Sequence, residues 1–106
     1  MSEFIVVLVT CGKKEEAEKI AESLILERLA ACVNIVPAVS SIYFWEGRIC
    51  NEQELLLIIK TTTILYTRLE KRVKDLHSYE VPEIISIPLE QGSAKYLKWI
   101  KDTVEQ

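Results

Sequence analysis

The segment ELLLIIKTT, residues 54–62, constrains the fold more than any other stretch of the chain. Its apolar residues occupy both alternations of an extended chain, whereas a strand with one face in water alternates apolar with polar residues. Such a run indicates a strand inside a sheet with both faces covered. It is far shorter than the roughly 20 apolar residues of a membrane-spanning helix. The chain is therefore expected to build a sheet around this strand.

The elements before this strand follow from their periodicity. An extended, β-branched stretch over residues 3–11 precedes a helical pattern over residues 13–31, where apolar residues recur at three- and four-residue spacing. A second extended stretch covers residues 33–45 and contains Pro37, which must lie at an edge or a bulge because proline cannot donate to a ladder. A loop over residues 46–53 is expected to return the chain into the central strand as a hairpin.

The elements after the central strand complete the pattern. A second amphipathic helix is expected over residues 64–77, with a threonine of the 61–63 run able to cap its start. Pro82 then favours an extended chain, and residues 83–89 form a fourth apolar strand. A short final helix begins near residues 92–93.

The resulting order, β-α-β-β-α-β-α, defines the fold class. It is the split βαβ, or ferredoxin-like, arrangement: an α+β fold with an antiparallel sheet and one added C-terminal helix. Right-handed crossovers place the first and third strands at the centre and both main helices on one face of the sheet. The opposite face remains uncovered.

Length, composition and charge limit the class of protein. The 106 residues, 49% of them hydrophobic, predict a single globular domain over residues 1–106. The net charge is −3 with basic and acidic residues interleaved, which argues against a nucleic-acid partner. No apolar run is long enough to span a membrane, and the first residues, MSEF, do not have the pattern of a signal peptide. We expect a cytoplasmic protein.

The uncovered sheet face predicts self-association. The two central strands carry apolar residues on both alternations, and monomers rarely leave more than a few hundred Å² of such surface in water. The hairpin, with Tyr43, Phe44 and Trp45 near its tip, is long enough to reach a neighbouring copy. The alternative is that the C-terminal helix covers part of this face.

His77, the one histidine, is the first candidate metal ligand. In the split βαβ topology the end of the second helix and the end of the first strand share one edge of the sheet, which places His77 and Cys11 together. A thiolate and an imidazole, with Glu80 or Glu83 adding an oxygen, form a ligand set that copper or zinc accepts. The alternative is that His77 caps the helix and the cysteines are small buried hydrophobes.

The other candidates are more scattered. Cys32 lies at the opposite edge of the same subunit, so it would meet the first group only across an oligomer interface. Lys60 ends the buried strand, where a cation must be paired or lie at the rim. Glu46, beside Trp45 at the hairpin tip, is either a solvated turn residue or part of an intersubunit cleft. Residues 12–14 offer amides and positive charge at a helix start, a weak anion site.

No catalytic group is evident. The single imidazole is paired in sequence with no nucleophile or orienting acid, so we do not expect an enzyme. The central strand lacks the aromatic and basic residues with which RNA-recognition domains stack bases. The stretch TCGKKEE also lacks the C-x-x-C of copper chaperones with this fold.

Three strings carry a family resemblance: ERLAACVNIVPAVSSIYFWEGRI, ELLLIIKTT and LHSYEVPEIISIPLEQGSAKYLKWI. They and their spacing resemble the CutA divalent-cation tolerance proteins over nearly the whole chain. The positions that match the family's motifs are Cys32, Trp45, Glu46, Lys60, His77, Tyr79, Glu80 and Pro82. One position departs from the pattern, since Ser78 stands where the family usually has proline.

The resemblance implies a tight homotrimer with interlocking hairpins and a link to tolerance of copper and other divalent cations. On this basis we expect a metal-binding trimer, for copper or another divalent ion, with His77, Cys11, Cys32 and Glu80 as ligands. The intersubunit clefts would be lined by Trp45, Glu46, Lys60 and Tyr79. Two alternatives remain: a trimer like the nitrogen-regulatory signal proteins, which binds a small anionic metabolite and signals to a partner protein, and an adaptor trimer without a ligand.

Overall fold

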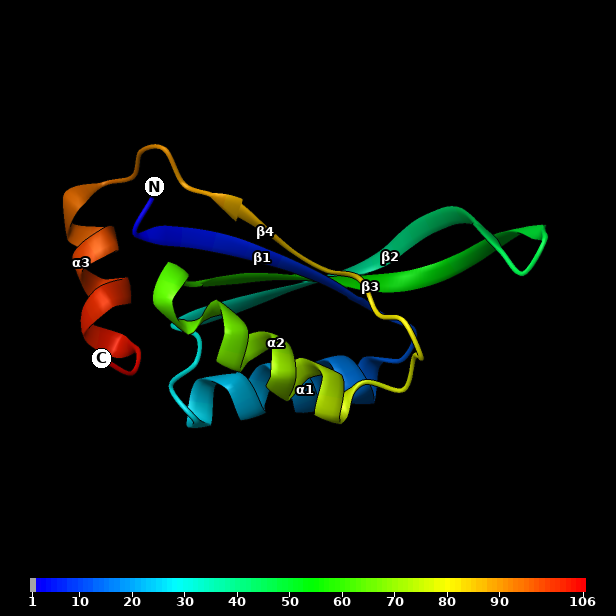
Figure 1. Ribbon diagram of the computed structural model, residues 1–106, viewed down its shortest axis with the longest axis horizontal. Coiled ribbons are helices and arrows are strands. Elements are labelled where there is room, and N and C mark those ends of the chain that lie inside the picture. Colours follow the sequence, from blue (N-terminus) through cyan, green and yellow to red (C-terminus); the bar gives the residue numbers. More distant parts are fainter. Residues whose placement is uncertain (1) are drawn as a thin grey trace.

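A computed structural model describes residues 2–106. Its elements are β1 (Phe4–Cys11), α1 (Lys14–Leu26), β2 (Cys32–Trp45), β3 (Arg48–Thr62), a 3-10 turn η1 (Thr63–Leu65), α2 (Tyr66–Leu76), β4 (Ile84–Pro88) and α3 (Ala94–Thr103). The strands form one antiparallel sheet in the order β2-β3-β1-β4. Helices α1 and α2 lie side by side on one face, and α3 stands at the end of the sheet (Figure 1). The predicted ferredoxin-like α+β fold is confirmed.

The core lies between the sheet and the two main helices. Alternate residues of β1, from Ile5 to Cys11, point toward the helices and are buried, as the period of two requires. They meet fully buried side chains of β3, α1 and α2, among them Leu57, Ile59, Ile20, Leu24, Leu69 and Val73. Each such side chain contributes about 1.5–3 kcal/mol by leaving water. Cys11 is the last inward-facing residue of β1, so the core ends in a thiol.

Both main helices are shorter than the periodicity predicts. Helix α1 ends at Leu26 rather than near residue 31, because Arg28 takes a left-handed conformation (φ 59°) that turns the chain. Helix α2 begins at Tyr66 after the 3-10 turn, and no threonine side chain caps either element. The hydroxyls of Thr61 and Thr63 instead donate to the carbonyls of Leu29 and Ser2, at 2.7 and 2.6 Å. Contacts distant in sequence thus replace the predicted cap.

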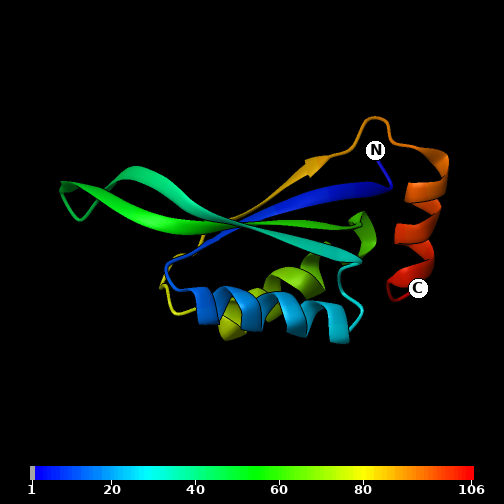
Figure 2. The same cartoon turned by 180° about the vertical axis from the view of Figure 1, so that it is seen from behind.

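The loop predicted over residues 46–53 is wrong. β3 already begins at Arg48, and the turn is the pair Glu46 and Gly47, with φ of 49° and 81°. Two consecutive positive φ angles are typical of the two-residue turn that matches the twist of a hairpin. The ladder continues through the polar residues after it, and the hairpin extends well beyond the helices (Figures 1 and 2).

Pro37 lies at a bulge of the strand at the sheet edge, as its missing N–H predicts. The register between β2 and β3 shifts between Val36 and Val39, and Ala38 adopts a φ of 59°. A bulge bends a strand and increases its local twist. The hairpin beyond it is therefore rotated relative to the rest of the sheet.

In residues 2–106, no helix covers the sheet face opposite α1 and α2 (Figure 2). On this face, Ile85 and Ile87 of β4 are about half exposed and Val36 of β2 is 38% exposed. The register places Ile42, Phe44 and Ile49, which are 70–71% exposed, on the other face of the hairpin, beyond the helices. Helix α3 does not cover them, because it stands beyond the end of the sheet and its Ile100 packs into the core (Figure 1). In residues 2–106 no helix is both long enough and apolar enough to cross a bilayer.

Candidate metal centre and adjoining pocket

The structure brings Cys11 and His77 together. Cys11 ends β1 and His77 immediately follows α2, and both elements finish at the same edge of the sheet. Cys11 Sγ lies 3.8 Å from His77 Nε2, and that nitrogen lies 2.7 Å from the carbonyl oxygen of Thr10. The Cys11 side chain is fully buried, so the pair closes the end of the core.

Glu16 completes this group and was not among the predicted ligands. Its Oε2 lies 3.5 Å from His77 Nδ1, and one donor atom each from Cys11, Glu16 and His77 lie within 4.8 Å of one another. Among residues 2–106, this Oε2 is the buried side-chain atom left without a hydrogen-bond partner. Glu16 lies one helical turn before Ile20 on the inward face of α1. This position among the apolar residues could have predicted that Glu16 faces the interior.

The hydrogen bonds indicate which His77 nitrogen carries the proton. The backbone N–H of Tyr79 donates to Nδ1 at 3.1 Å, so Nδ1 is the acceptor. Nε2 then holds the proton and donates it to the Thr10 carbonyl. Ser78, which departs from the family pattern, is exposed, while these two bonds fix the ring next to it.

The thiol of Cys11 is protonated at neutral pH. Burial, followed by the charges of Glu16 and Glu54, raises its pKa to about 12. A metal ion must therefore displace this proton to use the sulfur as a ligand. Sulfur, imidazole nitrogen and carboxylate oxygen suit copper or zinc, and the unpaired oxygen of Glu16 fits a bound cation.

The other predicted metal ligands lie elsewhere in the subunit. On β3, Cys32 pairs with Lys60 and Cys11 pairs with Leu55. These two positions of β3 are five residues apart. This separation corresponds to about 17 Å along a strand. Glu80 is exposed and does not join the group of Cys11, Glu16 and His77.

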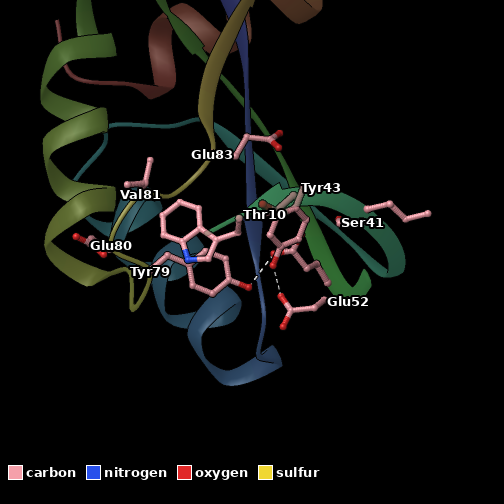
Figure 3. Close-up of a pocket in the computed structure, with 11 residues that line it drawn as sticks. Thr10, Ser41, Tyr43, Glu52, Tyr79, Glu80, Val81 and Glu83 are labelled. Carbon is pink, nitrogen blue, oxygen red and sulfur yellow. Dashed lines mark hydrogen bonds between the residues drawn. The ribbon is translucent and has the colours of Figure 1, made fainter. Parts of the chain in front are cut away.

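The predicted cleft residues are also divided. Lys60 donates to Asn34 Oδ1 at the far end of the sheet, and Glu46 is an exposed turn residue. Trp45 and Tyr79, in contrast, line one pocket of about 620 Å³ between the hairpin, the end of β1 and the loop before β4. Figure 3 shows how the aromatic side chains face this pocket.

Tyr79 connects the pocket with the metal group. Its backbone binds His77, its ring lies 4.7 Å from the imidazole, and its hydroxyl donates to Glu54 Oε2 at 2.8 Å. On the hairpin side, Tyr43 donates to Glu52 in the same way (Figure 3). Burial first, and then the bond to Glu54, raises the pKa of Tyr79 well above its usual range. The family resemblance grouped Trp45 with Tyr79, whereas the pocket glutamates Glu52 and Glu54 were not predicted to join them.

Comparison with known proteins identifies the family. The family described as CutA1 divalent ion tolerance protein matches residues 5–103. The chain belongs to this family. It is 52% identical over 97 residues to the divalent-cation tolerance protein CutA of Thermus thermophilus. The aligned residues cover 92% of this chain and 94% of that protein. It is 48% identical to the chloroplastic protein CutA 1 of Oryza sativa, of whose length it spans 58%.

Solved structures of the family share the fold. The structure of the Thermus thermophilus protein superposes with a TM-score of 0.94, at 49% identity, over 96% of this chain and 99% of that chain. The CutA1 structure from Oryza sativa gives a TM-score of 0.96 at 47% identity, over 99% of this chain and 96% of that chain. The ferredoxin-like subunit is thus common to bacterial and plant members.

Proposed function

We propose that this protein is a cytoplasmic homotrimer that binds a divalent metal, copper in the first place, with the Cys11, Glu16 and His77 group as its site. Membership of the family supports a role in tolerance of divalent cations. The observation that carries the metal site is the close approach of a thiol, a carboxylate and an imidazole, with one buried carboxylate oxygen unpaired. The proposal is a binding role without catalysis.

The uncovered apolar surface supports the trimer. The exposed isoleucines of β4 and the apolar side of the hairpin would be costly to leave in water, and other copies of the chain can bury them. Within one chain, Cys32 lies too far from His77 to bind the same metal ion. In a trimer, Cys32 would bind a metal only at the site of a neighbouring subunit. Light scattering on the untagged protein tests this, and a monomer in dilute solution would contradict it.

The reducing environment of the cytoplasm suits the cysteines. Cys11, Cys32 and Cys50 are all free thiols, which are typical of intracellular proteins. Cell fractionation with an antibody against the native protein tests the location, and recovery outside the cytoplasm would contradict it.

Calorimetric titration tests the metal site. Untagged protein is titrated with Cu²⁺ and, separately, Zn²⁺ under nitrogen. We expect His77→Ala and Cys11→Ser to weaken binding more than about 100-fold, beyond the 10–100-fold typical of outer-shell partners. Cys50→Ser is the matched control, because Cys50 lies in the hairpin opposite Tyr43. Unchanged affinity in both ligand variants would refute the site, and a loss in Cys32→Ser would assign a ligand across the interface.

The basic residues that would favour the anionic-metabolite alternative lie apart within residues 2–106. Lys60 and the lysines after Gly12 lie at different ends of the sheet, as the pairing of Lys60 with Val6 and Cys32 shows. The charged side chains of the pocket are all carboxylates, Glu52, Glu54, Glu80 and Glu83. This surface repels anions.

A further inference from the structure

The acidic pocket next to the metal group has the chemistry of a site for an organic cation. Its walls include the aromatic rings of Tyr43, Trp45 and Tyr79. No lysine, arginine or histidine lines it in the described part of the chain, whereas four glutamates do. Aromatic faces attract cations, and carboxylates accept hydrogen bonds from ammonium groups. Its volume of about 620 Å³ is that of a small-molecule site.

Glu54 gives the strongest sign that this pocket suits a cation. This carboxylate is 6% exposed, and its hydrogen bond in the structure comes from the Tyr79 hydroxyl. No positively charged side chain within residues 2–106 pairs with it. Buried carboxylates are almost always paired with a cation, because desolvation of an isolated charge is costly. The phenol of Tyr79 supplies a proton donor but no positive charge.

The spacing of the pocket glutamates suits a cation larger than a metal ion. In the described chain, Cys11, Glu16 and His77 form the group of acidic, thiol and imidazole side chains close enough to hold a metal. The pocket glutamates form no such group, so a single ion could not contact three of them. A molecule with separated charges could contact several at once.

We propose that this pocket binds an aliphatic amine with at least two ammonium groups. One ammonium lies between Glu54 and the aromatic rings of Tyr79 and Trp45. The second lies toward Glu80 and Glu83, which line the pocket from the loop before β4. The apolar carbon chain between the ammonium groups packs on Val81, which also lines the pocket.

Tryptophan fluorescence provides the test. The variant Trp99→Phe leaves Trp45 as the single reporter, since the sequence has two tryptophans. Oligomeric protein is titrated with 1,4-diaminobutane and with spermidine, and with succinate and 1,4-butanediol as anionic and neutral probes of similar length. We expect saturable changes in emission with the two amines alone, weakened by added salt.

Two substitutions locate the binding. Glu54→Gln keeps an acceptor for Tyr79 but removes the charge, and we expect about tenfold weaker amine binding or more. The double variant Glu80→Gln, Glu83→Gln changes exposed residues and so preserves folding; it should weaken the diamine several-fold while affecting 1-aminobutane less. Glu18→Gln, an exposed change on α1, is the matched control and should leave binding unchanged.

The outcomes are separable from the metal proposal. Absence of amine binding would overturn the inference. Equal binding by Glu54→Gln and the parent would overturn it as well. Cys11→Ser should retain amine binding while losing the metal, because Cys11 does not line the pocket, so either proposal can fail alone.

Discussion

Two acidic sites lie on either side of Tyr79, and the spacing of their polar side chains gives them different chemistry. On one side, Glu16 is packed against a thiol and an imidazole with no room for more than an ion. On the other, Glu54 faces an open pocket with aromatic walls and three further glutamates. Charge alone does not distinguish a metal site from an amine site. The distance between the donor atoms does.

The largest expected effect is the change of metal affinity with pH. Because the pKa of the Cys11 thiol is raised to about 12, binding should release one proton from it at any pH between 6 and 8. Metal affinity should therefore rise about tenfold per pH unit from this residue, or about 100-fold over the window. Calorimetry in buffers of different ionisation enthalpy counts the protons.

Two controls sharpen this prediction. Cys11→Ser should remove the proton release that belongs to the thiol. This thiol should add no pH dependence to the free energy of unfolding of the metal-free protein in the same window, because it is protonated in both the folded and unfolded states below its ordinary pKa of 9.0. Amine binding should vary much less between pH 6 and 8. A metal affinity that does not change with pH would contradict the prediction that the metal group and the amine pocket differ in pH dependence.

Tyr79→Phe breaks the connection between the two groups. The backbone N–H that orients His77 remains, while the hydroxyl that binds Glu54 is lost. We expect about 1–3 kcal/mol lower stability and weaker amine binding, with metal affinity within a few-fold of the parent. Urea denaturation and the two titrations measure these quantities. A large loss of metal affinity would show that the groups act as one site.

Glu16→Gln should separate stability from metal binding. Removing a buried, unpaired charge should stabilise the metal-free protein by about 1 kcal/mol, while the loss of a ligand weakens the metal. Glu18→Gln on the exposed side of α1 is the control. A destabilised Glu16→Gln protein would mean that the carboxylate has a partner in solution.

The smallest effect concerns the turn between the groups. His77 already has the extended conformation (φ −84°, ψ 140°) that a following proline requires. Ser78→Pro should therefore stabilise the protein by about 0.5 kcal/mol by restricting the unfolded chain, and leave both titrations unchanged. Thermal unfolding at matched oligomer concentration measures it, and destabilisation would show that the Ser78 backbone needs its N–H.

The sequence predicted what depends on periodicity and topology. The doubly apolar run of residues 54–62 was correctly assigned to a central strand, and the order of elements led to the approach of Cys11 to His77. The hairpin was underestimated because residues 48–53 are mostly polar, although pairing with β2 makes them a strand. Intrinsic preference was outweighed there by the partner strand.

The site itself was only partly predictable. Glu16 lies in the first turn of α1, where the helix dipole favours a negative charge, so its presence in the sequence does not require a partner. Its position on the inward face was the better guide. The pocket depends on the twist of a hairpin past the bulge and on the path of residues 79–83, which local patterns do not specify.

The bulge at Pro37 has a consequence for how assembly ends. β2 is a long strand at the edge of the sheet, and such an edge is a template on which further chains can add without limit. Pro37 removes one donor from that edge, and the adjoining shift in register breaks the regular spacing of the others. An incoming strand can therefore pair with one half of β2 or the other, but not with its whole length. Continuous edge-to-edge addition is thereby disfavoured, and with it the fibre that such addition would build.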